Sequence, residues 1–388
     1  MHISPRGPKL LVYYVYSRAV GHVIEGLRYA LGYHIANPSW EISLVMNKYS
    51  PWELAKLCPW IKNIYTVGIR GEKVRVPEKI HRHIPRRWDY MSVILDYKKN
   101  EPPWTAYYRC HEQMEAYFNN SFVAKKAYWK DDIIPYSRNQ QLKLVIPKVN
   151  ISWARKKLKN TDIKIGILPA GCNKKEYFPS VRSWDAIVNA LFKKYGSGLS
   201  IYFFGAFKKV GHRSISIIHK KGILRLIKKY KNCVNCIDVG LLNQLAVLEK
   251  CDVIISTESG FAYAALTVGT PFLEISGGPW PNYFHNGVPF YSVLPDIDKY
   301  PPLFMDRSKE KTINENGEEK ILSMSYRRII EDIPEILKGV DILINGKWVF
   351  PKHLKYYYGR LKKYYRDTKE MIFFDQTNKK YLYRKTKV

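Results

Sequence analysis

The fold is decided by the stretch CDVIISTESGFAYAALTVGTPFLEISGGP, which runs from Cys251 to Pro279. Two short apolar runs, at 253–256 and 272–275, have the length and composition of buried strands. Between them, residues 261–268 are mostly small or apolar and suit a helix that packs closely on a sheet. A strand, a helix and a second strand in this order predict a βαβ unit of a parallel sheet.

The loops that follow these two strands lie at the edge of such a sheet where ligands bind. Glu258, Ser259 and Gly260 join the first strand to the helix, whose first turn exposes unpaired backbone amides and a partial positive charge. Gly260 lets a diphosphate approach the backbone, and Glu258 would accept hydrogen bonds from ribose hydroxyls. Gly277 leaves the second strand at the same edge. A simpler interpretation stays open, in which Ser259 caps the helix and Gly277 turns the chain.

The same alternation of strands and helices extends over most of the chain. Strands are expected at 10–16, 40–46, 64–67, 92–96, 163–168, 200–204, 236–238, 253–256 and 272–275. Helices are expected after residue 22 to about 31, and at 51–57, 104–117, 184–194, 215–229, 242–250, 261–268 and 326–337, with a polar loop at 308–320.

The length of 388 residues exceeds the ~250 to 300 at which one core stops growing. We therefore expect an α/β protein with two doubly wound Rossmann-like domains facing a cleft. The first spans residues 1–155 and the second 156–300. A helical extension and a basic tail rich in Tyr and Lys follow at 301–388.

The formal net charge of +30 favours an anionic partner, such as nucleotide phosphates, nucleic acid or an anionic membrane surface. The basic residues are scattered, and no zinc-finger, RNP or basic-zipper pattern occurs, so we expect no dedicated nucleic-acid binding. No stretch reaches the ~18 apolar residues of a membrane span. We expect a cytoplasmic protein and leave open a peripheral contact with the inner membrane face.

Six cysteines in a chain of this length predict no disulfide framework, and the thiols are expected to be reduced. Cys233 and Cys236 have CxxC spacing, but no second pair or nearby His completes a zinc site. No metal is therefore expected.

The second half resembles the donor-binding region of the glycosyltransferase-B fold, specifically the heptosyltransferase-like proteins of glycosyltransferase family 9. That family has Asp-Ser-Gly-x-x-His, then Gly-Thr-Pro, then a Phe-Gly-Pro loop. The matching positions here are Glu258-Ser259-Gly260-x-x-Tyr263, Gly269-Thr270-Pro271 and Ser276-Gly277-Gly278-Pro279. Further segments follow in the family's order: Leu168-Pro169-Ala170-Gly171, Arg182-Ser183-Trp184, Phe203-Phe204-Gly205 and Gly240-x-x-x-Gln244-Leu245. The resemblance covers residues 160–285.

This resemblance implies a nucleotide-diphosphate-sugar donor. Arg182 matches a family Lys that neutralises donor phosphate, and a guanidinium does this with bidentate geometry. The expected donor-binding residues are Gly21, Gly171, Arg182, Gly205, Glu258, Ser259, Gly260, Tyr263 and Gly277. The sequence departs from the family at Glu258, at Tyr263 and after Gly205, where Phe207-Lys208-Lys209 replaces an acidic residue. These departures leave the nucleotide base and the sugar unassigned.

The first domain offers a candidate base, because Gly21 and His22 follow the first strand. The family has Gly-Asp here, whereas other members of the fold superfamily have Gly-His. Inverting transfer needs a group that removes the proton of the acceptor hydroxyl, and a histidine titrates near neutrality. We expect His22 to be this base and Glu25, one turn along the helix, to orient or replace it. Gly21 would permit a tight turn and the close approach of the acceptor or donor. Alternatively, His22 is a helix-start histidine that bonds only to its own backbone.

The resulting hypothesis is a hexosyl- or heptosyltransferase that is metal-independent and inverting. It would need no cofactor beyond the nucleotide-sugar co-substrate, and its acceptor would be a glycan, a glycolipid or a small molecule. Two rivals remain. One is a non-catalytic nucleotide-sugar-binding or scaffold protein of the same fold. The other is a basic binder of nucleic acid or anionic membranes.

Overall fold

The chain divides into two compact units in the computed structural model. The described residues are 7–15, 20–68, 81–93, 122–128, 141–172, 174–209, 215–257, 259–277, 287–296, 298–301, 312–315 and 317–361. Those up to residue 128 belong to the first unit, and those from residue 141 onward belong to the second.

The domain boundary expected near residue 155 falls inside the second unit. Helix α3 (Lys148–Lys157) belongs to this unit because it packs on helix α6 (Leu241–Leu248). The side-chain amide of Asn150 donates a hydrogen bond of 2.7 Å to the Asn243 side chain across this contact. The polar, Lys-rich character of α3 reflects its outer face, which is exposed.

The first unit is a parallel sheet in the order β3-β2-β1-β4-β5. Its elements are β1 (Lys9–Tyr14), α1 (Val20–Ala36), β2 (Glu41–Asn47), the 3-10 helix η1 (Trp52–Leu57), β3 (Ile61–Val67), β4 (Arg87–Val93) and β5 (Val123–Tyr128). β4 begins before the expected strand at 92–96, because Trp88 and Met91 already face the core. The helix expected at 104–117 lies outside the described residues.

The second unit is a parallel sheet in the order β11-β10-β9-β6-β7-β8. Its strands are β6 (Ile163–Leu168), β7 (Leu199–Phe203), β8 (Cys233–Asn235), β9 (Val253–Ser256), β10 (Phe272–Ile275) and β11 (Phe290–Val293). The chain moves from β6 outward to β8, then crosses back to β9 and continues outward to β11. The strand order thus reverses between β6 and β9, which is the topological switch point of a doubly wound sheet. The predicted α/β class, with a Rossmann-like parallel sheet in each unit, is confirmed.

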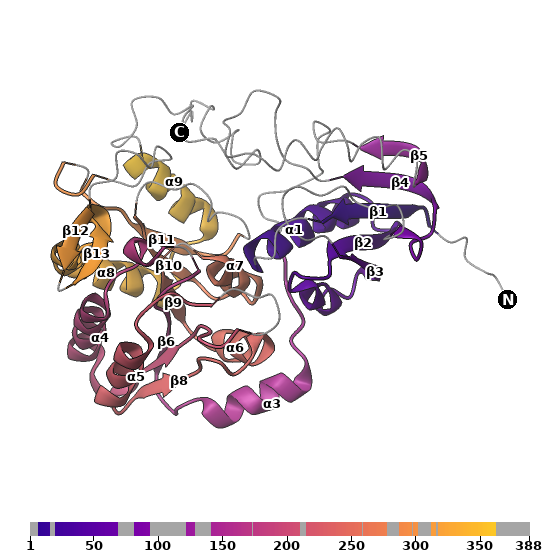
Figure 1. Cartoon of the computed structure of the whole chain (residues 1–388). Coiled ribbons are helices and arrows are strands. Elements are labelled where there is room, and N and C mark those ends of the chain that lie inside the picture. Colours follow the sequence, from indigo (N-terminus) through magenta and orange to yellow (C-terminus); the bar gives the residue numbers. More distant parts are fainter. Residues whose placement is uncertain are drawn as a thin grey trace. The chain divides into compact units, whose positions relative to one another are not determined.

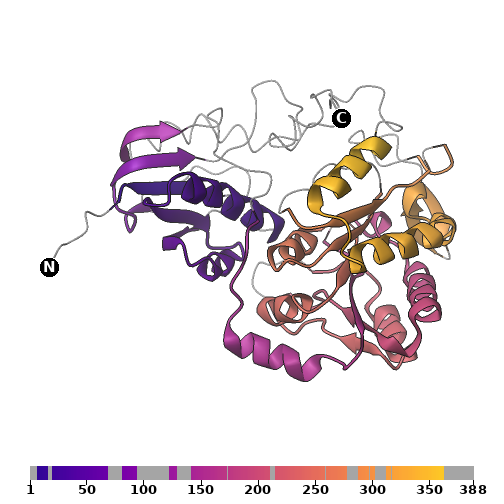
Figure 2. The ribbon, with the colours of Figure 1, turned by 180° about the vertical axis from the view of Figure 1, so that it is seen from behind.

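Both faces of this second sheet are covered. Ile165, Ile167 and Ile255 are buried in a core that also holds residues of α4 (Val181–Tyr195), α5 (Lys220–Lys229) and α8 (Tyr326–Ile344). Helices α6 and α7 (Gly260–Thr267) pack against each other, and α7 also contacts β9 and β10 (Figures 1 and 2). Strands buried on both sides read as continuous apolar runs rather than alternating ones, which is why the sequence revealed them.

Three expected elements of the second unit also differ in the structure. The strand expected at 236–238 lies earlier, at β8, because Asp238 turns the chain with a φ of 62°. The helix expected at 215–229 starts at Lys220, where the His219 ring accepts a hydrogen bond from the Gly222 amide. The polar loop expected at 308–320 contains an antiparallel hairpin, β12 (Thr312–Glu315) and β13 (Glu318–Ile321).

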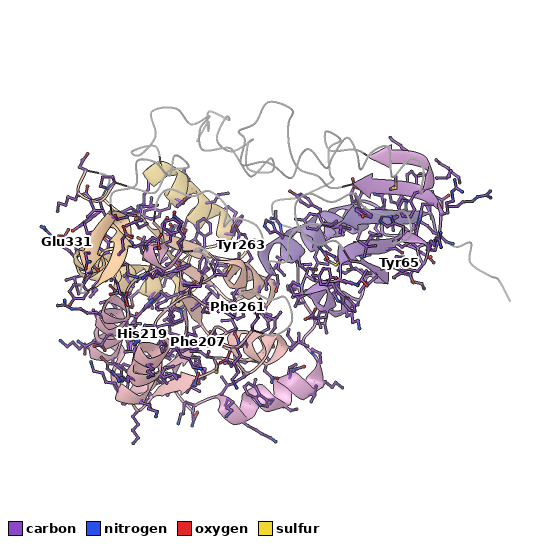
Figure 3. All side chains as sticks on the ribbon, in the orientation of Figure 1. Tyr65, Phe207, His219, Phe261, Tyr263 and Glu331 are labelled. Carbon is purple, nitrogen blue, oxygen red and sulfur yellow. The ribbon has the colours of Figure 1, made fainter. Side chains whose placement is uncertain are left out.

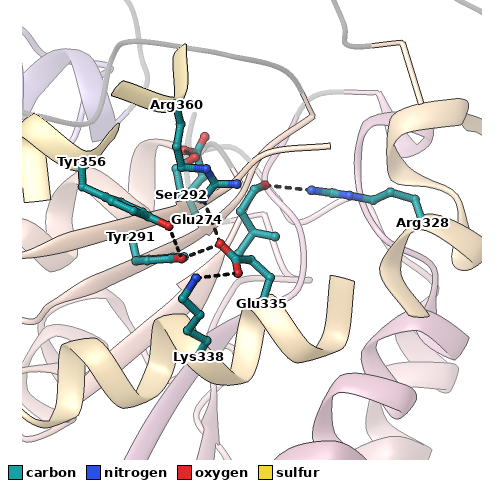
Figure 4. Close-up of polar contacts among 9 residues, drawn as sticks. Glu274, Tyr291, Ser292, Arg328, Glu335, Lys338, Tyr356 and Arg360 are labelled. Carbon is teal, nitrogen blue, oxygen red and sulfur yellow. Dashed lines mark hydrogen bonds and ion pairs between the residues drawn. The ribbon is translucent and has the colours of Figure 1, made fainter. Parts of the chain in front are cut away.

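The C-terminal helices complete the second unit. Helix α8 packs on β10, β11 and α4, and α9 (Phe350–Leu361) packs on β11. A polar network joins them, in which Glu335 accepts hydrogen bonds from Tyr291 at 2.5 Å and Arg360 at 3.1 Å (Figure 4). Burial raises the pKa of Glu335, but the Tyr291 hydroxyl and the Arg360 charge outweigh it and hold the pKa below its ordinary value. The helical extension expected after residue 300 is therefore a covering layer of this sheet.

We predict that His353 makes the second unit sensitive to acid. This side chain is 1% exposed and lies against the rings of Phe290 and Trp348. Burial lowers its pKa from 6.5 to about 4. At pH values above 6.5, His353 is neutral in both the folded and the unfolded chain, and the fold has its full stability. As the pH falls from 6.5 towards 4, only the unfolded chain binds the proton, so stability is lost. Between about pH 7.5 and pH 5 the loss amounts to about 2 kcal/mol.

The measurement is thermal unfolding of wild type and His353→Leu at both pH values. Wild type should lose several degrees more than the variant on acidification. An equal loss in the two proteins would show that other groups cause the acid sensitivity.

Candidate functional site

The candidate site lies at the switch point of the second sheet. β6 and β9 are paired so that Leu168 lies opposite Ser256, and both strands end at this level. The loops that leave them meet directly, since a Cβ built on Gly171 would lie 3.1 Å from the Cβ of Ser259. Gly171 thus permits a close approach that a larger residue would hinder. The structure brings together two residues that the sequence singled out separately.

Ser259 is the N-cap of α7, and its hydroxyl accepts a hydrogen bond of 3.3 Å from the Ala262 amide. The capping interpretation is therefore correct for this side chain. Gly260 opens the helix, and both residues are half-buried. The remaining first-turn amides have no partner within the helix and carry its partial positive charge. Tyr263 follows on α7, and Figure 3 labels both it and Phe261 on this helix. Glu258 lies outside the described residues.

The loop after β6 is held from behind. The indole nitrogen of Trp184 donates a hydrogen bond of 3.0 Å to the Pro169 carbonyl, and its ring is fully buried in the core. The amide of Ile217 donates to the Gly171 carbonyl at 2.9 Å. Trp184 and Ile217 together anchor the backbone from Pro169 to Gly171.

The loop after β7 is fixed by two polar side chains. Gly205 has a φ of 135°, and its N–H and C=O both bond to the Gln244 side-chain amide, at 3.2 and 2.8 Å. One carboxylate oxygen of Asp238 accepts from the amides of Phe207 and Lys208, at 2.7 and 2.9 Å. Asp238 is not among the site residues predicted from the sequence. The signal available was an acidic residue soon after a short strand on the same sheet edge.

Arg182 and Gly277 meet a segment that the sequence analysis did not include in the site. Arg182, the second residue of α4, is exposed, and its guanidinium carbon lies 3.9 Å from the centroid of the Tyr326 ring. A Cβ built on Gly277, which follows β10, would lie 3.0 Å from the Met324 side chain. Both contacts involve residues at or just before the start of α8.

In the first unit, Gly21 and His22 lie in the first turn of α1, and both are half-buried. The expected tight turn at Gly21 is wrong, because this residue is helical. α1 packs closely on β1, since a Cβ built on Gly26 would lie 2.5 Å from the Tyr14 ring. Glu25 belongs to the same helix, and its side chain lies outside the described part of the structure.

Burial raises the pKa of both Cys233 and Cys236 to about 12, so these thiols are poor nucleophiles and poor metal ligands. Across the described ranges, no group of three His, Cys, Asp or Glu side chains is placed to hold a metal ion. The helices of those same ranges include none that is both long and apolar enough to span a membrane.

We predict that Gln244→Leu destabilises the second unit by about 1 to 3 kcal/mol, because it removes both side-chain hydrogen bonds to buried Gly205. Denaturant unfolding would measure this. Lys250→Ala, which changes an exposed residue just after the same helix, should stay within about 0.5 kcal/mol of wild type. A Gln244→Leu protein as stable as wild type would exclude the anchoring role.

Comparison with models of known protein families, and with curated protein sequences, finds no match. Among solved structures, the glycosyl transferase family 9 protein from Veillonella parvula DSM 2008 matches with a TM-score of 0.60 and 14% identity, over 88% of this chain and 98% of that one. E. coli ADP-heptose LPS heptosyltransferase II matches with a TM-score of 0.49 and 13% identity, over 86% and 99%. The sequence resemblance is thus confirmed at the level of the fold: the chain shares the Rossmann-like, glycosyltransferase-B type architecture of the family 9 structure.

Proposed function

We propose that this protein is a glycosyltransferase that moves a sugar from a nucleotide-diphosphate-sugar to a hydroxyl acceptor. One observation carries the proposal: Gly171 lies against the Ser259 N-cap at the switch point between β6 and β9. This arrangement combines a side-chain-free backbone with a helix N-terminus, which together suit a diphosphate. The fold shared with a family 9 glycosyltransferase supports the same activity.

In this proposal, the amides at Ser259 and Gly260 and the guanidinium of Arg182 bind the donor diphosphate. Negative charge grows on the diphosphate as the bond to the sugar breaks, so the same groups stabilise the transition state. Because fixed donors and a cation supply this stabilisation, we propose that transfer needs no metal. Activity should then survive dialysis against EDTA.

The acceptor reacts in a single displacement. Its hydroxyl oxygen attacks the anomeric carbon, the bond to the diphosphate oxygen breaks, and the hydroxyl proton passes to the imidazole of His22. One displacement inverts the anomeric configuration. The nucleotide diphosphate leaves with the electron pair of the broken bond.

We predict that Arg182→Ala and Gly260→Val each weaken donor binding about 10- to 100-fold, through loss of a charged hydrogen-bond donor and blocked access to the backbone. His22→Ala should preserve donor binding and slow transfer about 100- to 10,000-fold. A thermal-shift screen of ADP-, UDP-, GDP- and dTDP-sugars selects the donor, and calorimetry and a transfer assay then compare the variants.

Lys193→Ala is the matched control for Arg182→Ala, since it removes a cation from the other end of α4. Weakened donor binding with unchanged turnover in His22→Ala would contradict the assigned base. Tight donor binding with no transfer or hydrolysis by wild type would instead favour the non-catalytic scaffold.

A peripheral membrane contact, as a glycolipid acceptor would require, has support from α3. Its exposed face carries Lys148, Arg155 and Lys156, and residues 141–161 contain no acidic residue. Val149 in α3 is 74% exposed, and Val145, just before the helix, is 58% exposed. Exposed aliphatic residues among cations favour an anionic lipid surface over nucleic acid.

We predict that the protein sediments with phosphatidylglycerol-containing vesicles but not with pure phosphatidylcholine. Reversing the charges of Lys148, Arg155 and Lys156 to Glu should abolish this binding. The control reverses Lys221, Arg225 and Lys228 on α5, where every exposed residue is Lys or Arg. An equal loss in both triple variants would mean that net charge alone drives binding.

A further inference from the structure

A segment from the C-terminal part of the chain touches the candidate donor loops at three places. Lys320, on β13, donates a hydrogen bond of 2.9 Å to the Lys175 carbonyl, in the loop between β6 and α4. Met324 lies against Gly277, after β10. Tyr326 stacks on Arg182, at the start of α4. We call residues 318–326 the bracing segment, because it contacts both the connection from β6 to α4 and the loop after β10.

The contact between Tyr326 and Arg182 constrains the proposed phosphate-binding cation. A distance of 3.9 Å from the guanidinium carbon to the ring centroid is that of a close cation–π stack. Arg182 is otherwise exposed, and a free arginine side chain has about 2 kcal/mol of rotamer entropy to lose. Stacking uses the face of the guanidinium and leaves the N–H groups at its edge for an anion.

Tyr326 is itself held in place. It is the first residue of α8, its amide donates a hydrogen bond of 2.6 Å to Glu315, and Ser325 caps the helix. Arg328 has no exposed surface, appears in Figure 4, and donates to the carbonyls of Ser323 and Val293 at 3.1 and 2.8 Å. An ion pair of 2.6 Å with Asp332 offsets its buried charge.

Lys320 braces the other side of the same region. Its side chain is 3% exposed, and its ammonium group bonds to the Lys175 carbonyl and pairs with Glu318 at 3.3 Å. The connection from β6 to α4 is therefore bonded to the hairpin at Lys175, and Arg182, at the start of α4, packs on the Tyr326 ring. Packing and buried polar contacts thus hold both Lys320 and Tyr326 in fixed positions.

We propose that Tyr326 is a positioning residue of the diphosphate site: its ring holds the Arg182 guanidinium in one orientation, with the N–H edge presented to the donor diphosphate. This inference rests on the proposed function. It adds a residue far from the motif region of the sequence, on an element that covers the sheet. The ligand chemistry is a diphosphate, free or within a nucleotide-sugar.

The test is calorimetric binding of inorganic diphosphate and of the nucleotide-sugar that gives the largest thermal shift. Tyr326→Leu should weaken both about fivefold, the effect of a single exposed cation–π contact and some lost preorganisation. Tyr326→Phe keeps the ring and should bind as wild type. In an Arg182→Ala background, Tyr326→Leu should weaken binding no further, since the two residues act as a unit.

The unfolding temperature of each variant separates positioning from general destabilisation. Wild-type affinity in Tyr326→Leu, or equal losses with and without Arg182, would overturn the inference while leaving the diphosphate site in place. A Tyr326→Phe protein that binds diphosphate as weakly as Tyr326→Leu would overturn it too. If wild type binds neither inorganic diphosphate nor any nucleotide-sugar, the proposed function and this inference fail together.

Discussion

The site depends on the parallel pairing of β6 with β9. Leu168 and Ser256 lie opposite each other, so the two strands end at one level and their loops leave side by side. The connections after these two strands run in opposite directions across the sheet, and ligands bind at this point in folds of this kind. Gly171 matters because the backbone after β6 must pass close to Ser259 at this point. A bulky residue there would push these two loops apart.

The loops around the switch point owe their shape to side chains that bond to their backbone, two of them buried (Trp184 and Gln244) and one exposed (Asp238). Trp184 binds the Pro169 carbonyl, Gln244 binds both polar groups of Gly205, and Asp238 binds two amides beyond it. A buried backbone group without a partner is costly, so these bonds fix one loop conformation. Binding groups on such loops keep their geometry before any ligand arrives, which lowers the free energy lost on binding.

The sequence was sufficient where a structure depends on local signals. β6, β9 and β10 match the predicted bounds residue for residue, because each is a short, mostly apolar run bounded by proline or polar residues. The hairpin β12–β13 was predicted as a loop because its strands are short, polar and partly exposed. The stack of Tyr326 on Arg182 joins distant parts of the chain, and the sequence around neither residue predicts it. Contacts of this kind arise from the packing of α8 on α4, which no local pattern encodes.

The large positive charge has a different role from that of the site. Exposed cations cover α3 and α5, and their attraction for anions is screened within about 10 Å at moderate salt. Such a field raises the local concentration of anionic partners without choosing among them. Selection requires donors fixed in direction, and the described residues supply these at the start of α7 and at the braced Arg182. Charge therefore explains an attraction to anions in general, whereas the proposed binding of a diphosphate depends on the geometry at the switch point.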